Sequence, residues 1–125
     1  MAVILVIDDD ADFLESLCEI LSQSGHQVMG HARADSALLQ LEQRMPDLLI
    51  TDLVMPVMNG AEFLLTVQDT YSGFPCPVIA MSGGGRFDTV PVFDSIKDMP
   101  VDAVLRKPFS LDVLEAHISD LLTGG

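Results

Sequence analysis

The chain has 125 residues, 49 % of them hydrophobic, and its 19 acidic residues against 6 Lys and Arg give a formal charge of −13. This length and apolar content predict a single folded domain over residues 1–125, with no second domain attached. The few basic residues are scattered, which argues against direct binding to nucleic acid or to an anionic membrane surface. A divalent cation or a basic protein surface is a better partner for so acidic a chain.

The opening apolar run, residues 3–7, is too short for a membrane span and has no basic flank, so it predicts a strand and not a signal peptide. Cys18 and Cys76 have neither the spacing of a metal site nor that of a disulfide framework. The simplest interpretation is a cytosolic chain with reduced thiols.

The first half of the chain predicts a strand over 3–7, a helix over 11–24, a short strand over 27–31 and a helix over 35–44. Gly25 is the expected stop signal of the first helix. The apolar face of that helix is expected to comprise Phe13, Leu14, Leu17, Ile20 and Leu21.

The second half continues the alternation. The expected elements are a strand over 47–51, a helix from 60 to about 71, a strand over 77–81, a weaker helix between 87 and 98, a strand over 102–105 and a last helix capped by Ser110. Strands separated by helices indicate parallel βαβ units with right-handed crossovers. The strands are apolar throughout, which is typical of a sheet covered by helices on both faces.

Function in such a sheet collects where the strands end. The residues at the expected strand ends are Asp8, Asp9 and Asp10, then Asp52, Ser82 and Lys107. Carboxylates in this number suit Mg²⁺, which takes one or two carboxylates and borrows phosphate oxygens. A carboxylate can itself be the nucleophile and form an aspartyl phosphate. A hydroxyl and an ammonium group would then bind the oxygens of the transferred group.

Other polar residues have simpler interpretations. Asp10 and Asp12 fall at the start of the first helix, where carboxylates favour the positive end of the helix dipole. His26, His31 and His117 show no metal-binding spacing and are expected at the surface or at strand edges.

Four motifs, "VIDDD", "ITDLVMPVMNG", "VIAMSG" and "LRKPF", stand in this order at the strand ends. With these motifs the chain resembles the receiver domain of two-component response regulators over essentially its whole length. The resemblance implies a flavodoxin-like (βα)5 fold, in which a parallel five-stranded sheet of order 2-1-3-4-5 lies between two layers of helices. It also implies a bacterial phosphoacceptor signalling protein, either a final output protein or a phosphorelay intermediate, and not an enzyme in the ordinary sense.

By the same resemblance, Asp52 is the phosphoacceptor, and Ser82 and Lys107 contact the phosphoryl group. The phosphodonor is expected to be a sensor histidine kinase or a histidine phosphotransfer protein. A slow self-catalysed dephosphorylation is expected as well. A downstream protein target would bind the face formed by the fourth helix, the fifth strand and the fifth helix.

The resemblance further implies a Mg²⁺ ion bound directly by Asp9 and Asp52, by Asp8 mainly through water, and by the carbonyl of Val54. The chain departs from the family pattern at Val104, where an aromatic residue often acts as a rotameric switch. A second departure is the long, Gly- and Pro-rich segment that follows Ser82.

Three other functions stay open. A phosphohydrolase with an aspartyl-phosphate intermediate would need an acid two residues after Asp52, where this chain has Val54. A flavodoxin-like cofactor binder would need a phosphate-binding loop after the first strand, where this chain has acids. The third is a receiver-like module whose protein interactions do not depend on phosphorylation.

Overall fold

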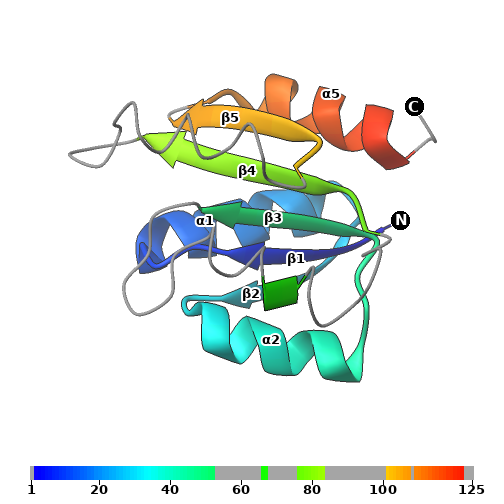
Figure 1. Ribbon diagram of the computed structural model, residues 1–125. Coiled ribbons are helices and arrows are strands. Elements are labelled where there is room, and N and C mark those ends of the chain that lie inside the picture. The colour runs from blue at the N-terminus through cyan, green and yellow to red at the C-terminus, as the bar shows by residue number, and fades with distance from the viewer. Residues whose placement is uncertain (1, 53–65, 68–75, 84–100, 108, 123–125) are drawn as a thin grey trace.

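Strands and helices alternate over the first 52 residues of the chain (Figure 1). The computed structural model describes residues 2–52, 66–67, 76–83, 101–107 and 109–122. The strands are β1 (Val3–Ile7), β2 (Gln27–His31), β3 (Leu48–Asp52), β4 (Val78–Gly83) and β5 (Ala103–Lys107). The labelled helices are α1 (Ala11–Gln23), α2 (Ala34–Gln43) and α5 (Leu111–Leu122). Within this part of the chain, no helix has both the length and the apolar character needed to cross a bilayer.

The strands form one parallel sheet in the order β2-β1-β3-β4-β5, which confirms the flavodoxin-like topology expected from the sequence. β1 lies between β2 and β3, so that Ile7 has His31 on one side and Thr51 on the other. All five residues of β3 are buried. Burial on both faces is the reason that these strands are apolar at consecutive positions and not at alternate ones.

Helices cover both faces of the sheet, with α1 and α5 on one face and α2 on the other (Figure 1). Successive strand residues point to opposite faces. Accordingly, Ile4 and Ile50 pack with α1 and α5, whereas their neighbours Leu5 and Leu49 pack with α2. The core is therefore two apolar layers separated by the sheet.

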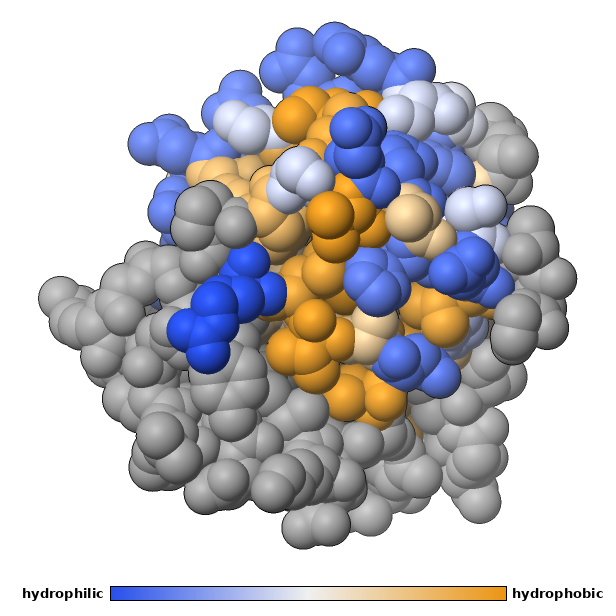
Figure 2. Space-filling model, turned by 90° about the horizontal axis from the view of Figure 1, so that it is seen from above, coloured by the Kyte–Doolittle hydropathy of each residue, from blue (hydrophilic) through white to orange (hydrophobic). Residues whose placement is uncertain are grey.

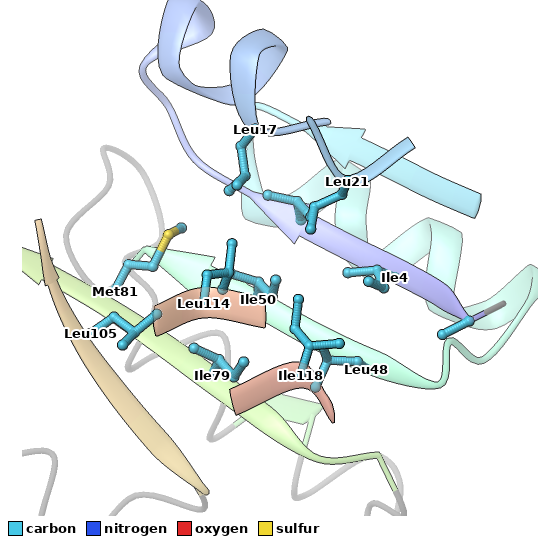
Figure 3. Packing of buried hydrophobic residues seen from close by; sticks show 12 residues of the cluster. Ile4, Leu17, Leu21, Leu48, Ile50, Ile79, Met81, Leu105, Leu114 and Ile118 are labelled. Atoms are coloured by element: carbon cyan, nitrogen blue, oxygen red, sulfur yellow. The ribbon is translucent and has the colours of Figure 1, made fainter. Parts of the chain in front are cut away.

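The layer beneath α1 and α5 is shown in Figure 3. Leu17 and Leu21 of α1, together with Leu114 and Ile118 of α5, reach the same face of the sheet. The strand residues that they meet are Ile4, Leu48, Ile50, Ile79, Met81 and Leu105. Ile20 was expected on the same face of the helix, but it is 36 % exposed, because Leu17 and Leu21 already define the buried stripe.

The helix ends follow the sequence signals. The carboxylate of Asp10 accepts a hydrogen bond from the amide of Phe13 at 3.2 Å and so caps α1. Gly25 lies two residues beyond the end of α1 with a φ of 97°, a conformation that favours glycine. The hydroxyl of Ser110 accepts from the amide of Val113 at 3.2 Å and caps α5 as expected.

Two aspartates extend the hydrogen bonding of the sheet by one residue at the edge where the strands begin. Asp47 donates its amide to the carbonyl of Val3 at 2.7 Å, and its Oδ2 accepts from the amide of Val3 at 2.9 Å. Asp102 makes the same pair of bonds with Val78, at 2.8 Å for both. In each case the carboxylate accepts a hydrogen bond from a backbone amide that a backbone carbonyl would accept if the strands were longer.

The expected and observed bounds differ in the later strands. β3, β4 and β5 each begin one residue later than expected and end one or two residues later. Backbone pairing continues past the last apolar residue, so hydrophobicity alone places the strand end too early. The helices expected over 60–71 and 87–98 lie outside the described residues, apart from 66–67, which are helical. Val67, in this short helical stretch, is 1 % exposed.

Candidate functional site

Three carboxylates meet where β1 and β3 end. Asp8 and Asp9 directly follow β1, and Asp52 is the last residue of β3, the neighbouring strand. One oxygen from each of the three side chains lies within 4.8 Å of the others. Asp8 is fully buried and Asp52 is 7 % exposed, whereas Asp9 is open to solvent. The sequence prediction that these three acids would come together is confirmed.

The main chain around Asp8 fixes the position of its carboxylate. The amide of Asp8 donates to the carbonyl of His31 at 3.1 Å, which carries the pairing of β1 and β2 one residue past the strand end. Its Oδ1 accepts from the amide of Asp10 at 2.9 Å. Asp8 is therefore held by backbone groups on both sides, and neither contact could be found by inspecting residue types alone.

Asp52 is held by the strand that contains it. β3 pairs with β1 on one side and with β4 on the other, where Asp52 lies beside Met81. The hydroxyl of the buried Thr51 donates to the carbonyl of Asp52 at 3.0 Å. A carboxylate at the end of a central, doubly paired strand has little freedom to move away from Asp8.

The consecutive acids have separate roles. Asp10 points its carboxylate at the start of α1 and not at the three-acid group, which confirms its interpretation as a helix-start residue. Asp12 is an exposed residue of the first turn of α1. The sequence prediction that the acid run divides into site residues and helix-start residues therefore agrees with the structure.

The three-acid group fits a hard divalent cation. Like charges about 4 Å apart repel by about 4 kcal/mol at the effective dielectric constant near a protein surface. Mg²⁺ prefers oxygen ligands, binds through one or two carboxylates and keeps several waters. One solvent-open acid beside two buried ones provides protein ligands on one side and access for water and phosphate on the other.

The backbone places Ser82 and Lys107 at the same edge of the sheet. In the register of β4 and β5, Ser82 lies beside Arg106, and Gly83 lies beside Lys107. Ser82 is the residue after Met81, which in turn lies beside Asp52. Both residues thus stand at the carboxyl end of the sheet, as the sequence predicted, whereas Val54 lies outside the described residues.

Comparisons of this chain with known proteins all find members of the same family. The family model of the response regulator receiver domain matches residues 4–119. The phosphate regulon transcriptional regulatory protein PhoB of Escherichia coli is 29 % identical over 121 residues, covering 95 % of this chain and 51 % of that protein. The response regulator Rre1 of Synechocystis is 31 % identical over 121 residues, with the same coverage of 95 % and 51 %. The chain thus spans about half the length of these relatives.

Solved structures agree with the sequence relatives. The signal receiver domain of a signal transduction histidine kinase from Syntrophus aciditrophicus has a TM-score of 0.89 at 26 % identity, over 99 % of this chain and 92 % of that one. The receiver domain of NtrX from Brucella abortus has a TM-score of 0.82 at 27 % identity, over 98 % and 99 % of the two chains. Almost the whole chain therefore has a counterpart in each of these two domains.

Proposed function

This chain belongs to the family of response regulator receiver domains, and on that basis we propose that it accepts a phosphoryl group on Asp52 from a sensor histidine kinase or a histidine phosphotransfer protein. The observation that carries the proposal is the group formed by Asp8, Asp9 and Asp52 at the carboxyl edge of the sheet. This group contains a nearly buried nucleophile candidate at the end of a central strand, with two further acids to hold a cation beside it.

In the proposed reaction, a carboxylate oxygen of Asp52 attacks the phosphorus of a phosphohistidine. A P–O bond forms while the P–N bond breaks, and the electron pair of the broken bond stays with the imidazole nitrogen of the donor. Asp52 is only 7 % exposed, so the donor can approach its carboxylate from the solvent side alone. Lys107 and Ser82 would bind the oxygens of the transferred group from β5 and β4.

We propose that Asp9 and Asp52 ligate Mg²⁺ directly, that Asp8 binds it mainly through water, and that the Val54 carbonyl completes the protein ligands. When bound, this ion neutralises the negative charge that gathers between the carboxylates and the phosphoryl oxygens. The role of Asp8 through water agrees with its position, because its Oδ1 already accepts from the amide of Asp10.

The proposed product is a signal and not a released metabolite. Phosphorylation would change protein contacts at the face formed by the expected fourth helix, β5 and α5, and the aspartyl phosphate would decay slowly without a partner. Figure 2 looks onto the side that includes α5 and shows apolar side chains gathered among polar ones. On α5, Leu111 and Val113 are 42 % and 45 % exposed, so the first turn of this helix offers exposed apolar side chains to a protein target.

Val104 constrains how such a signal would form. It lies beside Ala80 in the sheet and packs, partly buried, against the core layer that contains α2. A branched aliphatic side chain at this position cannot make the ring rotation that an aromatic residue would make. We therefore propose that the output depends on movement of the chain around Ser82 and Lys107. The proposed setting is the cytoplasm, with proteins, and not nucleic acid or a membrane, as partners.

The experiment that tests this function is a phosphorylation assay on three proteins. Wild type, Asp52→Asn and Asp12→Asn are incubated with Mg²⁺ and a small phosphodonor, and each intact mass is measured with and without hydroxylamine. Asp12 is the matched control because it is an exposed acid of the nearby first turn of α1. We expect a hydroxylamine-labile adduct on wild type and Asp12→Asn, and none on Asp52→Asn.

Two results would contradict the proposal. If Asp52→Asn were labelled as strongly as wild type, another residue would carry the phosphoryl group. No labelling of wild type by small donors or by histidine kinases would leave the phosphorylation-independent interaction module as the better account. Rapid turnover of phosphomonoesters would instead favour the phosphohydrolase.

A further inference from the structure

A second candidate site lies at the opposite edge of the sheet, where the strands begin. A cavity of about 500 Å³ is lined there by Ala2, His26, Asp47, Pro77, Leu121 and Leu122. The first four of these residues immediately precede β1, β2, β3 and β4, and the two leucines form the last turn of α5. The cavity is therefore separated from the three-acid group by the full length of the sheet.

Its size and lining suit a small molecule. Binding sites for such ligands measure about 300–1,000 Å³ and combine apolar walls with a few polar groups. Here Ala2, Pro77 and the two leucines supply apolar surface, while His26 and Asp47 supply the polar groups. None of these six described residues is a Lys or Arg, so none of them brings a permanent positive charge to the carboxylate of Asp47.

Asp47 is an exposed residue, and a ligand could take the place of water at one of its carboxylate oxygens. Its Oδ2 accepts the amide of Val3 at 2.9 Å, whereas no described residue donates to its Oδ1. A carboxylate that is already oriented by one backbone bond presents its second oxygen without a further loss of side-chain freedom.

A second carboxylate stands beside the lining. Oε2 of Glu115, on α5, is 4.0 Å from Nε2 of His26. Nδ1 of His26 accepts a hydrogen bond from the amide of Ala2 at 3.4 Å. The other oxygen of Glu115, Oε1, is buried and has no hydrogen-bond partner among the described residues. A buried carboxylate oxygen without a donor is unfavourable, and a cation nearby would lower its free energy.

We propose that this cavity binds a small organic cation, that is, an ammonium or guanidinium group on a short apolar body. The charged group would lie against Oδ1 of Asp47, and the negative charge of Glu115 would add to the attraction. The apolar body would contact Leu121, Leu122 and Pro77. An anion of the same shape would be repelled. The proposal does not depend on phosphorylation of Asp52, which lies at the other edge of the sheet.

The first experiment uses three probes with the same ring, namely benzylammonium, benzyl alcohol and benzoate. Each is titrated into ¹⁵N-labelled protein saturated with Mg²⁺, and the amide shifts are followed by NMR. We expect benzylammonium to shift the amides of Ala2, His26 and Leu122. Benzyl alcohol should bind about ten-fold more weakly and benzoate should not bind, because a charge-assisted hydrogen bond is lost. Equal binding of the alcohol and the ammonium, or shifts confined to residues near Asp8 and Asp52, would overturn the proposal.

The second experiment uses a pair of matched variants. Asp47→Asn removes the charge but keeps an oxygen that can accept the amide of Val3. Asp102→Asn makes the same change in the equivalent contact with Val78, outside the cavity lining. We expect Asp47→Asn to weaken benzylammonium binding about ten-fold and Asp102→Asn to leave it unchanged. Equal affinities of both variants and wild type would refute the site, and the probe series on wild type decides the question if Asp47→Asn does not fold.

Discussion

The amide of Asp10 donates to the buried carboxylate of Asp8 at 2.9 Å, while the carboxylate of Asp10 caps α1. A single residue thus joins the acid site to the first helix by two bonds of different kinds. One is made by the main chain and survives any substitution except proline. The other is made by the side chain. The two roles can therefore be separated by mutation.

Replacing Asp10 by Ala should lower the free energy of unfolding by about 1 kcal/mol, because α1 loses its cap. Replacing it by Ser should restore most of that loss. Mg²⁺ affinity should change little in either variant, because the bond to Asp8 comes from the backbone. Chemical denaturation and a Mg²⁺ titration measure the two quantities. A large loss of Mg²⁺ affinity in Asp10→Ala would show that its carboxylate belongs to the metal site.

Mg²⁺ should raise the melting temperature of the wild-type protein, because it relieves repulsion among Asp8, Asp9 and Asp52. Asp9→Asn should be more stable than wild type without Mg²⁺, by about 1 kcal/mol, since one of three repelling charges is gone. Its melting temperature should hardly respond to Mg²⁺. Asp12→Asn, which changes an exposed acid outside the group, should respond as wild type does. An equal response of Asp9→Asn and wild type would contradict the assignment.

Core packing predicts that two substitutions of aliphatic residues will differ greatly in their effect on stability. Ile50 is fully buried between α1 and α5, and Ile50→Ala should reduce the free energy of unfolding by about 2–5 kcal/mol. Leu39 of α2 is 61 % exposed, and Leu39→Ala should change the free energy of unfolding by less than about 0.5 kcal/mol. Urea denaturation measures both values. Similar losses in the two variants would mean that Leu39 is covered in solution.

Burial, together with the negative charges of Asp47 and Asp102, raises the pKa of the Cys76 thiol from 9.0 to about 12. The unfolded thiol loses its proton near pH 9, whereas the folded one keeps it up to about pH 12. The unfolded state therefore binds fewer protons in this window. Stability should fall as the pH rises through it, by at most about 1.4 kcal/mol per pH unit.

Two measurements test the raised pKa and the burial of the Cys76 thiol. The pH dependence of unfolding should be weaker in Cys76→Ser than in wild type above about pH 9. At about pH 8, a thiol reagent should modify Cys18, which is only partly buried, faster than Cys76. Faster modification of Cys76 in the folded protein would contradict its protonated, buried state.

A parallel sheet covered on both faces, with acids at its carboxyl edge, could be expected from the sequence because both features depend on simple periodic signals, whereas the strand order was implied by the family resemblance. Consecutive apolar residues such as Leu49 and Ile50 indicate a strand buried on two faces. A parallel sheet brings the residues that follow its strands to one edge, which places Asp52 beside Asp8. These inferences require no knowledge of individual contacts.

Other features could not be found in this way because they depend on the register between distant segments. Asp47 binds the amide of Val3 across 44 positions of sequence. Similarly, His26 lies directly before the edge strand β2, as expected, but residue types alone do not show that its side chain is only 14 % exposed or that it contacts the amide of Ala2 and Glu115 of α5. Ile20 fits the apolar period of α1, yet the width of the covered stripe leaves it 36 % exposed. Each outcome is set by tertiary packing.

The most direct test of the central claim is to locate the phosphoryl group. The protein is phosphorylated in the presence of Mg²⁺ by a small donor and reduced with borohydride, which converts an aspartyl phosphate to homoserine, and the peptides are sequenced by mass spectrometry. The account predicts homoserine at position 52 and at no other acid, and only after treatment with the donor. Homoserine at Asp8 or Asp9, or intact aspartate at position 52 in a protein that carries phosphate, would contradict it.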